Sequence, residues 1–323
     1  IRRDGGECLL PGDMNTTMSY HVPVLLNESV DALAIKPDGV YVDATFGGGG
    51  HSREILSRLG QGGRLFAFDQ DSEVPAGEID DPRFTFVGEN FRYMSRYLRF
   101  YRVEAVDGIL ADLGVSSHQF DTAGRGFSIR YDGPLDMRMN PSGGLTAAQV
   151  VNEYEAEELA DLFYRYGELR QGRALARQIL RKRPIATTGE LMAALEGFAA
   201  PGRENKFFAQ VFQALRIAVN DELGALEDFL TQSGEVLREG GRLSVISYHS
   251  LEDRLVKNFI RSGRFSGEVE KDFYGNPLRP LQPVERKAIV PLEREMAENS
   301  RARSARLRVG EKVVGQHDKN GKR

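Results

Sequence analysis

Val40-Tyr41-Val42-Asp43-Ala44-Thr45-Phe46-Gly47-Gly48-Gly49-Gly50-His51 is an apolar run that ends in an acid and continues into four consecutive glycines. Its β-branched and aromatic residues favour a buried strand, and the glycines favour a tight turn into the helix-like segment that follows. A backbone without Cβ atoms can approach a bound molecule closely, and the free N–H groups of the helix start face the same crevice. The stretch therefore predicts a strand, a ligand-binding turn and a helix; a glycine-rich turn that binds no ligand is the alternative.

The glycine spacing differs from the fingerprint of dinucleotide-binding proteins. If Gly47 opened a GxGxxG motif, the third glycine would stand at position 52, which is Ser52. The carboxylate of Asp43, four residues ahead of the glycines, also suits a positive ammonium better than a pyrophosphate. A nicotinamide-dependent oxidoreductase, which the strand pattern alone would permit, is therefore disfavoured.

Further strands are predicted along the chain at residues 64–68, 84–87, 106–111 and 242–247. The first four strands, counted from 40–43, each end in a polar or glycine cluster. Such clusters describe one crevice at the carboxyl edge of a parallel sheet. Two short segments, 287–291 and 305–309, could close the sheet as an antiparallel pair. The sequence thus predicts an α/β fold.

Two residues at this sheet edge have competing interpretations. Asp69 ends the second strand 19 residues beyond Gly50, where α/β nucleotide folds place a carboxylate that binds ribose hydroxyls. A cap on the following turn would also explain Asp69. Phe91 follows the third strand and could stack on an adenine, although a core position is the more common role of phenylalanine.

The pattern becomes helical after about residue 120. Capping-box pairs at Thr146/Gln149 and Thr187/Glu190 predict two helix starts, and residues 205–226 form the longest helical pattern. Between residues 165 and 183, seven cations accompany a single acid. Such a composition suits phosphates, and a solvated helix face explains it almost as well. The cations are Arg165, Arg170, Arg173, Arg177, Arg181, Lys182 and Arg183.

His249 follows the predicted strand 242–247. Ser250 with Asp253 fits an N-cap pair, so a helix is expected to start there, with His249 at the strand-to-helix junction and facing the crevice. A structural histidine and a functional one explain this position equally well. Five scattered histidines and one cysteine predict no metal site, and the lone Cys8 excludes an intramolecular disulfide.

Composition and charge narrow the class of protein. No apolar run reaches the length of a membrane span and the start lacks the apolar core of a secretory signal, so a cytoplasmic protein without a membrane partner is expected. Residues 286–323 contain 11 basic and 5 acidic residues, a charge of +6 on a chain whose net charge is −4. A basic end on an acidic body favours a polyanionic partner, with a solvated terminus as the alternative.

Eight segments taken together resemble the RsmH/MraW family of bacterial 16S ribosomal RNA cytosine-N4 methyltransferases. They are 21–25 (HVPVL), 43–51 (DATFGGGGH), 107–117 (DGILADLGVSS), 125–128 (RGFS), 133–139 (GPLDMRM), 212–217 (FQALRI), 247–254 (SYHSLEDR) and 301–304 (RARS). The resemblance implies an enzyme that uses S-adenosylmethionine to methylate the exocyclic amine of a cytidine in the decoding region of small-subunit ribosomal RNA. An RNA-binding ribosome-assembly protein with a vestigial pocket is the alternative.

The resemblance also implies an architecture. We expect the class I S-adenosylmethionine-dependent methyltransferase fold, a doubly wound, mostly parallel seven-stranded sheet, with an inserted helical domain. The methyltransferase domain would comprise residues 18–119 and 216–312, and the inserted substrate-recognition domain residues 120–215. Residues 1–17 would be a disordered extension and residues 313–323 a loose basic tail.

By the same resemblance, the cofactor would contact Gly49, Gly50, His51, Asp69, Phe91, Asp112 and Gln119. Asp112 follows the fourth strand, where amine methyltransferases often carry an Asn/Asp-Pro-Pro-aromatic motif, and it is a catalytic candidate together with His249. The substrate-binding candidates are Arg138, Arg173, Arg177, Arg301 and Arg303. The expected partner is 16S rRNA, within the small ribosomal subunit; the oligomeric state is left open, a homodimer included.

Overall fold

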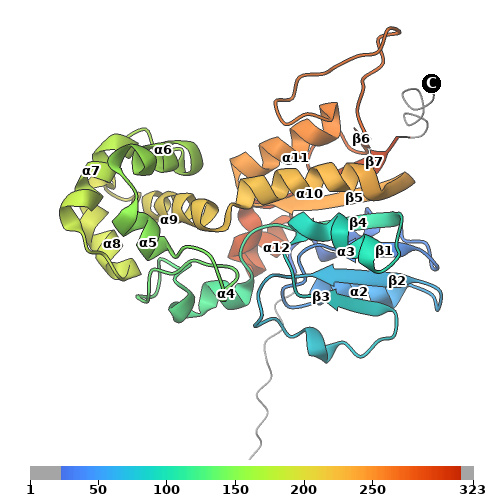
Figure 1. Ribbon diagram of the computed structural model, residues 1–323, viewed down its shortest axis with the longest axis horizontal. Coiled ribbons are helices and arrows are strands. Elements are labelled where there is room, and N and C mark those ends of the chain that lie inside the picture. The colour runs from blue at the N-terminus through green and yellow to red at the C-terminus, as the bar shows by residue number, and fades with distance from the viewer. Residues whose placement is uncertain (1–22, 314–323) are drawn as a thin grey trace, which may run out of the picture.

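The computed structural model describes residues 23–313, which form a sheet covered by helices and, beside it, a separate group of helices (Figure 1). The expectations for residues 1–17 and for the tail after Val313 lie outside the described residues. None of the helices between residues 23 and 313 has both the length and the apolar character that crossing a bilayer requires.

The sheet has seven strands in the order β3-β2-β1-β4-β5-β7-β6. They are β1 (Val40–Asp43), β2 (Arg64–Phe68), β3 (Phe84–Val87), β4 (Val106–Asp112), β5 (Leu237–Ser247), β6 (Leu281–Pro283) and β7 (Arg306–Lys312). The first five pair in parallel, whereas β7 pairs antiparallel with both β5 and β6. The doubly wound, mostly parallel α/β sheet of the class I methyltransferase fold is thereby confirmed.

One predicted strand is wrong. Residues 287–291 form only an isolated bridge, in which Ile289 and Leu307 exchange two backbone hydrogen bonds of 2.9 Å. Pro291 has no N–H group with which to extend that ladder. The edge beside β7 is instead occupied by β6, which pairs with Gly310 to Lys312.

Helices cover both faces of the sheet. On one face, α1 (Leu26–Asp31) and α2 (Gly50–Arg58) pack on Tyr41 and Leu65. On the other face, α3 (Met94–Phe100), α10 (Glu222–Val236) and α11 (Ser250–Ser262) enclose the larger apolar core of the sheet. The short helices α4 (Ser117–Asp121) and α12 (Glu293–Glu298) follow β4 and precede β7. The helices named here as covering the sheet pack on its two faces. The carboxyl ends of β1 to β4 lie at an edge between these faces.

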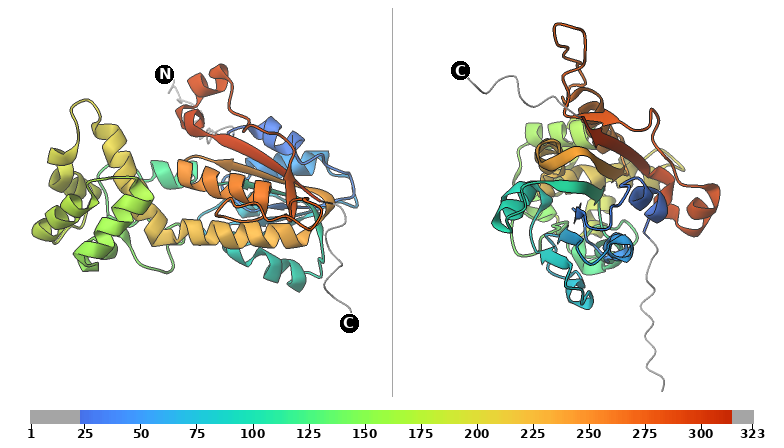
Figure 2. Two further views of the ribbon diagram at one scale, coloured as in Figure 1. Left: turned by 90° about the horizontal axis from the view of Figure 1, so that it is seen from above. Right: turned by 90° about the vertical axis from the view of Figure 1, so that its right-hand side faces the viewer.

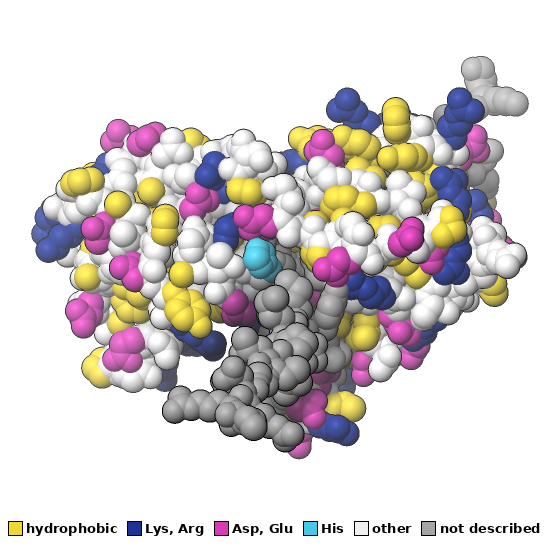
Figure 3. Space-filling view, turned by 90° about the horizontal axis from the view of Figure 1, so that it is seen from below, with side chains coloured by type: hydrophobic (Ala, Val, Ile, Leu, Met, Phe, Trp, Pro, Cys, Tyr) yellow, Lys and Arg dark blue, Asp and Glu magenta, His cyan; other side chains and the backbone are white. Residues whose placement is uncertain are grey.

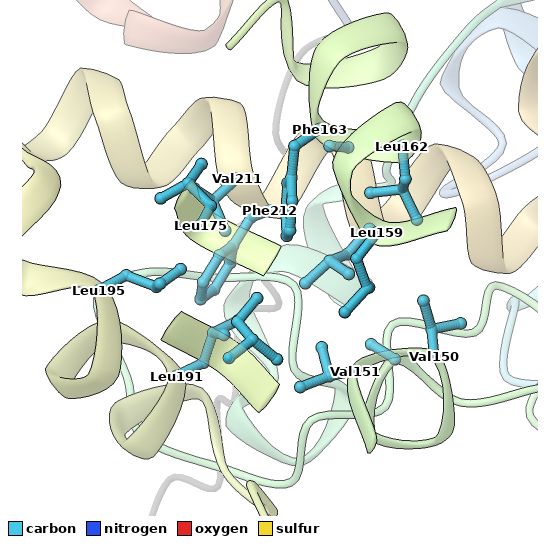
Figure 4. Close-up of a cluster of buried hydrophobic side chains, with 14 of the residues drawn as sticks. Val150, Val151, Leu159, Leu162, Phe163, Leu175, Leu191, Leu195, Val211 and Phe212 are labelled. Carbon is cyan, nitrogen blue, oxygen red and sulfur yellow. The ribbon is translucent and has the colours of Figure 1, made fainter. Parts of the chain in front are cut away.

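The helical group lies at one end of the molecule (Figures 1 and 2). It comprises α5 (Ala147–Glu153), α6 (Ala156–Gly167), α7 (Gly172–Lys182), α8 (Thr188–Leu195) and most of α9 (Glu204–Asn220). Figure 4 shows the core of this group, where Phe163 of α6 and Phe212 of α9 lie among leucine and valine side chains from the other helices. Both predicted capping boxes, at Thr146 and at Thr187, are present.

The helix predicted over residues 205–226 is in fact two helices. Asp221 adopts a left-handed backbone conformation, with φ 46° and ψ 46°, and ends α9 immediately before α10 begins. Aspartate tolerates this conformation better than most residues. The apolar period continues across the break because α9 packs in the helical group through Phe212, whereas α10 packs on the sheet through Leu226.

Candidate cofactor and substrate site

The glycine turn after β1 is held by the acid that precedes it. Asp43 is fully buried, and its carboxylate accepts hydrogen bonds from the Thr45 backbone N–H (3.1 Å) and the Ser52 hydroxyl (2.6 Å). Burial raises the pKa of Asp43 to about 6, although these two hydrogen bonds oppose the shift. Asp43 therefore fixes the turn, and both of its carboxylate oxygens already accept hydrogen bonds within the protein.

The four glycines of the turn have different surroundings. A Cβ atom on Gly49, whose φ is +76°, would lie 2.8 Å from the Phe46 ring, and one on Gly50 would overlap the ring of Pro23. A Cβ atom on Gly48 would have no neighbour within 4 Å, and one on Gly47 only the Ser116 Cβ at 3.9 Å. The predicted contacts Gly49 and Gly50 thus have glycine for packing reasons, and the open space lies beside Gly47 and Gly48.

Asp69, at the end of β2, binds the backbone of two loops, the glycine turn after β1 and the loop after β2. Its carboxylate accepts the Gly47 N–H at 2.8 Å and the Asp71 N–H at 2.9 Å. Burial raises the pKa of Asp69 to about 6, against the effect of both hydrogen bonds. The interpretation of Asp69 as a cap of the following turn is therefore observed, and its position beside the glycine turn is compatible with the ribose role as well.

Asp112, at the end of β4, meets residues from three other segments. Tyr248 Oη donates to Asp112 Oδ1 at 2.7 Å, and the Asp112 N–H donates to Thr45 Oγ1 at 2.7 Å. His51 Nδ1 lies 4.0 Å from Asp112 Oδ2. Burial raises the pKa of Asp112 to about 7 and lowers the pKa of His51 to about 4. Asp112 can therefore exchange a proton near neutral pH, beside a neutral imidazole.

His249 is itself the N-cap of α11, which corrects the predicted Ser250/Asp253 cap. Its Nδ1 accepts the Glu252 N–H at 3.4 Å, and its Nε2 lies 3.1 Å from Glu252 Oε1. Ser250 instead donates to Glu168, and Asp253 pairs with Arg308. An imidazole nitrogen can accept at a helix start as a serine oxygen does, so the sequence pattern placed the cap one residue too late.

Glu222, His249 and Glu252 meet with their ligand-type atoms within 4.8 Å of one another. The sequence did not predict this cluster, because Glu222 and Glu252 come from different helices. Arg216 donates to both oxygens of Glu222, at 2.6 and 2.9 Å. Burial acts to raise the pKa of Glu252, but His249, Arg216 and the Tyr248 N–H together lower it. In this network the Arg216 guanidinium pairs with Glu222, and Glu252 is held by its contacts with His249 and with the Tyr248 N–H.

A cavity of about 40 Å³ lies among these residues. Its wall is lined by Thr45, Gln70, Asn90, Phe91, Leu113, Gly114, Met139, Asn220, Glu222, Ala225, Leu226 and Glu252. Of the predicted cofactor residues only Phe91 lines it directly, packed edge-on against Phe229 with ring centroids 5.2 Å apart. Gln119 points elsewhere, because its amide bonds Asp71 at 2.6 Å and the start of α4.

A family model described as the MraW methylase family matches residues 18–313 of this sequence. The chain belongs to the MraW methylase family. This methylase is 57% identical over 303 residues to the ribosomal RNA small subunit methyltransferase H of Flavobacterium johnsoniae, covering 93% of this chain and 100% of the relative. A protein of the same name from Amoebophilus asiaticus is 57% identical over 301 residues, which cover 92% and 97% of the two chains. The family resemblance drawn from the eight segments is thus confirmed.

The predicted substrate-binding arginines fall into two groups, those that pair with a carboxylate of the protein and those that are exposed without such a pair. Arg138 pairs with Asp136, and Arg301 pairs with Asp121 at 2.7 Å. Arg173, Arg177 and Arg303 are exposed, and within residues 23–313 none of them pairs with a carboxylate. In Figure 3, Lys and Arg side chains gather at the outer end of the helical group.

The seven cations between residues 165 and 183 do not form one face. Arg165 lies on α6 and pairs with Asp161, whereas Arg183 donates to the backbone carbonyls of Val151 and Tyr154. Arg173, Arg177 and Arg181 lie on α7. Of the seven cations, only those on α7 and its flanks therefore remain as candidates for one phosphate-binding face.

Proposed function

We propose that this protein transfers the methyl group of S-adenosylmethionine to the exocyclic N4 of a cytidine in the decoding region of small-subunit ribosomal RNA. The observation that carries the proposal is a cavity at the carboxyl ends of the parallel strands in a chain of the MraW methylase family. The relatives, named as ribosomal RNA small subunit methyltransferases, supply the class of acceptor. The proposed setting is the cytoplasm, with 16S rRNA in the small subunit as partner; a homodimer stays a prediction.

The chemistry asks mainly for positioning. The cofactor supplies a methyl group on a sulfonium, and in-line displacement by an amine needs close approach and exclusion of water more than a strong base. The N4 lone pair of cytosine is delocalised into the ring, so the site must accept an N–H hydrogen bond as that nitrogen rehybridises. The cytosine must also be unstacked from its RNA to enter.

Asp112 fits the acceptor role. Its partly buried carboxyl, with a pKa of about 7, can take the proton that N4 releases when the N4–CH₃ bond forms. Tyr248 holds Oδ1, which leaves Oδ2 for the amine. We assign His249 a positioning role through Glu252 and Tyr248, because Glu252 accepts the Tyr248 N–H at 3.0 Å.

The cofactor is assigned to the cavity and the adjoining glycine turn. Phe91 would flank the adenine, Asp69 the ribose, and the backbone of residues 47–51 the methionine end. Residues 120–215 would be the substrate-binding domain, with residues 18–119 and 216–312 as the methyltransferase domain. Arg173, Arg177 and Arg303 would contact RNA phosphates, whereas Arg138 and Arg301 would support the loops that they pair with.

The test is methyl transfer from isotope-labelled S-adenosylmethionine to small subunits isolated from a strain that lacks the activity. We expect one labelled nucleoside, N4-methylcytidine, on nuclease digestion and mass analysis. Unlabelled RNA together with tight RNA binding would favour the assembly protein with a vestigial pocket. Label at carbon 5 of cytidine would overturn the assigned acceptor atom.

A further inference from the structure

We propose that Asn220 is a positioning residue, whose amide holds residues 134–140 against the cofactor cavity so that Met139 forms part of the cavity wall. We call residues 134–140 the strap. The inference rests on the proposed function, because it takes this cavity as the S-adenosylmethionine site. The sequence pattern of α9 predicted no contact between Asn220 and residues 134–140.

The strap belongs to both parts of the molecule. Leu135 and Met137 are buried in the core of the helical group, and Met139 packs against the edge of that core while it also lines the cavity with Phe91 and Leu226. The strap therefore connects the core of the helical group to the cavity wall within five residues. A shift of the strap toward the helical group would withdraw Met139 from the cavity wall.

A single amide clamps the strap from the α9 side. Asn220 Oδ1 accepts the Met139 N–H at 2.7 Å, and Asn220 Nδ2 donates to the Met137 carbonyl at 2.8 Å. The same Nδ2 bonds the Arg216 carbonyl of α9 at 2.9 Å, which fixes the rotamer. Asn220 also lines the cavity itself and lies next to Asp221, where α9 gives way to α10.

The opposite side of the strap is tied to the loop after β2. Arg125 Nη2 donates to the carbonyls of Arg138 and Met139 at 3.0 and 3.1 Å, while Arg125 Nη1 pairs with Asp71 at 2.9 Å. Gln70 Nε2 lies 3.5 Å from the Met139 sulfur. The strap is thus held between the proposed ribose loop and the end of α9.

The strap conformation needs such a clamp. Met137 has φ 60°, a left-handed conformation that is unfavourable for a residue with a long side chain. A residue of this kind keeps such a conformation only where its surroundings enforce it. When the Asn220 amide is lost, Met137 should return to an ordinary conformation, and Met139 should leave the wall of the cavity.

The experiment compares two substitutions of the same chemistry. Asn220→Asp keeps the acceptor for the Met139 N–H but removes the donor to the Met137 carbonyl. Asn152→Asp is the matched control, because the Asn152 amide donates to the Ile185 carbonyl at 2.6 Å and accepts the Ile185 N–H at 2.9 Å, and Asn152 does not line the cavity. Dissociation constants for S-adenosylhomocysteine are measured by titration calorimetry, and melting temperatures are measured in parallel.

We expect Asn220→Asp to weaken binding of S-adenosylhomocysteine by about tenfold, the effect of one lost buried hydrogen bond. It should raise the KM for S-adenosylmethionine more than the KM for RNA. Asn152→Asp should lower the melting temperature but leave the dissociation constant within about twofold. An equal loss of affinity in both variants would overturn the inference, since both would then act through general stability.

A second pair keeps the test decisive if Asn220→Asp does not fold. Met139→Ala should weaken binding, whereas Met139→Leu, which conserves volume, should retain more of the affinity. If Met139→Ala binds S-adenosylhomocysteine as tightly as the wild type, this inference is overturned but the proposed function is not. A wild-type protein that does not bind S-adenosylhomocysteine overturns the proposed function and this inference with it.

Discussion

Buried and partly buried carboxylates lie on two sides of the cavity at the carboxyl ends of the parallel strands, and the two sides differ in the cations that contact them. Asp43, Asp69 and Asp112 end the strands of one side, and within residues 23–313 no Lys or Arg pairs with them. On the other side, Glu222 pairs with Arg216, and Glu252 Oε1 lies 3.1 Å from His249 Nε2. The pKa of each aspartate is raised by burial, whereas contacts lower the pKa of Glu252.

The difference favours the aspartate side as the place for a cationic ligand. The Glu222 side already has a counter-charge in Arg216. The aspartate side would gain from a positive ligand, and a sulfonium with an ammonium group supplies that charge. Substitutions on each side separately test this difference.

The largest effect is expected on the Glu222 side. Arg216→Met leaves Glu222 and Glu252 buried without their guanidinium, so the free energy of unfolding should fall by about 3 to 5 kcal/mol. Arg165→Met, which breaks the exposed pair with Asp161, should cost about 0 to 1 kcal/mol. Denaturant unfolding of both variants measures the difference. Equal losses would show that the Arg216 network is not a buried ion pair in solution.

The next effect concerns catalysis on the aspartate side. Asp112→Asn should lower the single-turnover methylation rate by about 100-fold or more, because the amide cannot take a proton from N4. Binding of S-adenosylhomocysteine should change little. Asp107→Asn is the control, since Asp107 is a buried acid on the same strand that pairs with Lys36 and Arg238. A rate in Asp112→Asn within a few-fold of wild type would remove Asp112 from the mechanism.

A smaller effect separates packing glycines from ligand-facing ones. Gly49→Val should lower stability by about 1 to 2 kcal/mol, because its left-handed backbone disfavours a Cβ atom that Phe46 also meets. Gly48→Val should keep the stability of the wild type but weaken cofactor binding by about tenfold. Thermal unfolding and calorimetric titration distinguish the two outcomes. Unchanged affinity in Gly48→Val would place the ligand elsewhere.

The smallest effect is a pH dependence of the unliganded protein. In the folded protein, Asp43, Asp69 and Asp112 have pKa values of about 6, 6 and 7, above the ordinary value of 3.8. At a pH between the ordinary and the raised values, the folded state therefore binds more protons than the unfolded state. Stability from these groups is therefore present at low pH and is lost as the pH rises from about 4 to about 7. The aspartates also become negatively charged over this range. The ratio of the affinity for cationic S-adenosylmethionine to the affinity for neutral S-adenosylhomocysteine should therefore increase from pH 5 to pH 8. A constant ratio would show that the aspartates do not sense the sulfonium charge.

Features with a local signal were predicted from the sequence. The bounds of β1, β2 and β4 follow from apolar runs that end at Asp43, Asp69 and Asp112, and the capping boxes at Thr146 and Thr187 act within four residues. The apolar pattern of a strand and the cap of a helix are both determined by residues close together in the sequence. They can therefore be identified without a structure.

Features that depend on distant contacts were missed. Asn220 and Met139 meet across 81 residues of sequence, and Glu252 joins Glu222 only when α10 and α11 pack together. The break between α9 and α10 had a weak signal, because Asn220-Asp221 is a pair that tolerates the left-handed conformation, but the unbroken apolar period outweighed it. Which of the four glycines faces a ligand depends on Phe46 and Pro23 and so was beyond local patterns.

The central claim is that cofactor and cytidine meet at the carboxyl ends of the parallel strands, in and around the cavity beside Phe91. A crystal structure of the protein with S-adenosylhomocysteine and cytidine tests this most directly. We predict the adenine against Phe91, the thioether near Gly48 and the cytidine N4 within hydrogen-bond distance of Asp112. A nucleoside bound outside this cavity, or an N4 group that faces away from Asp112, would contradict the account.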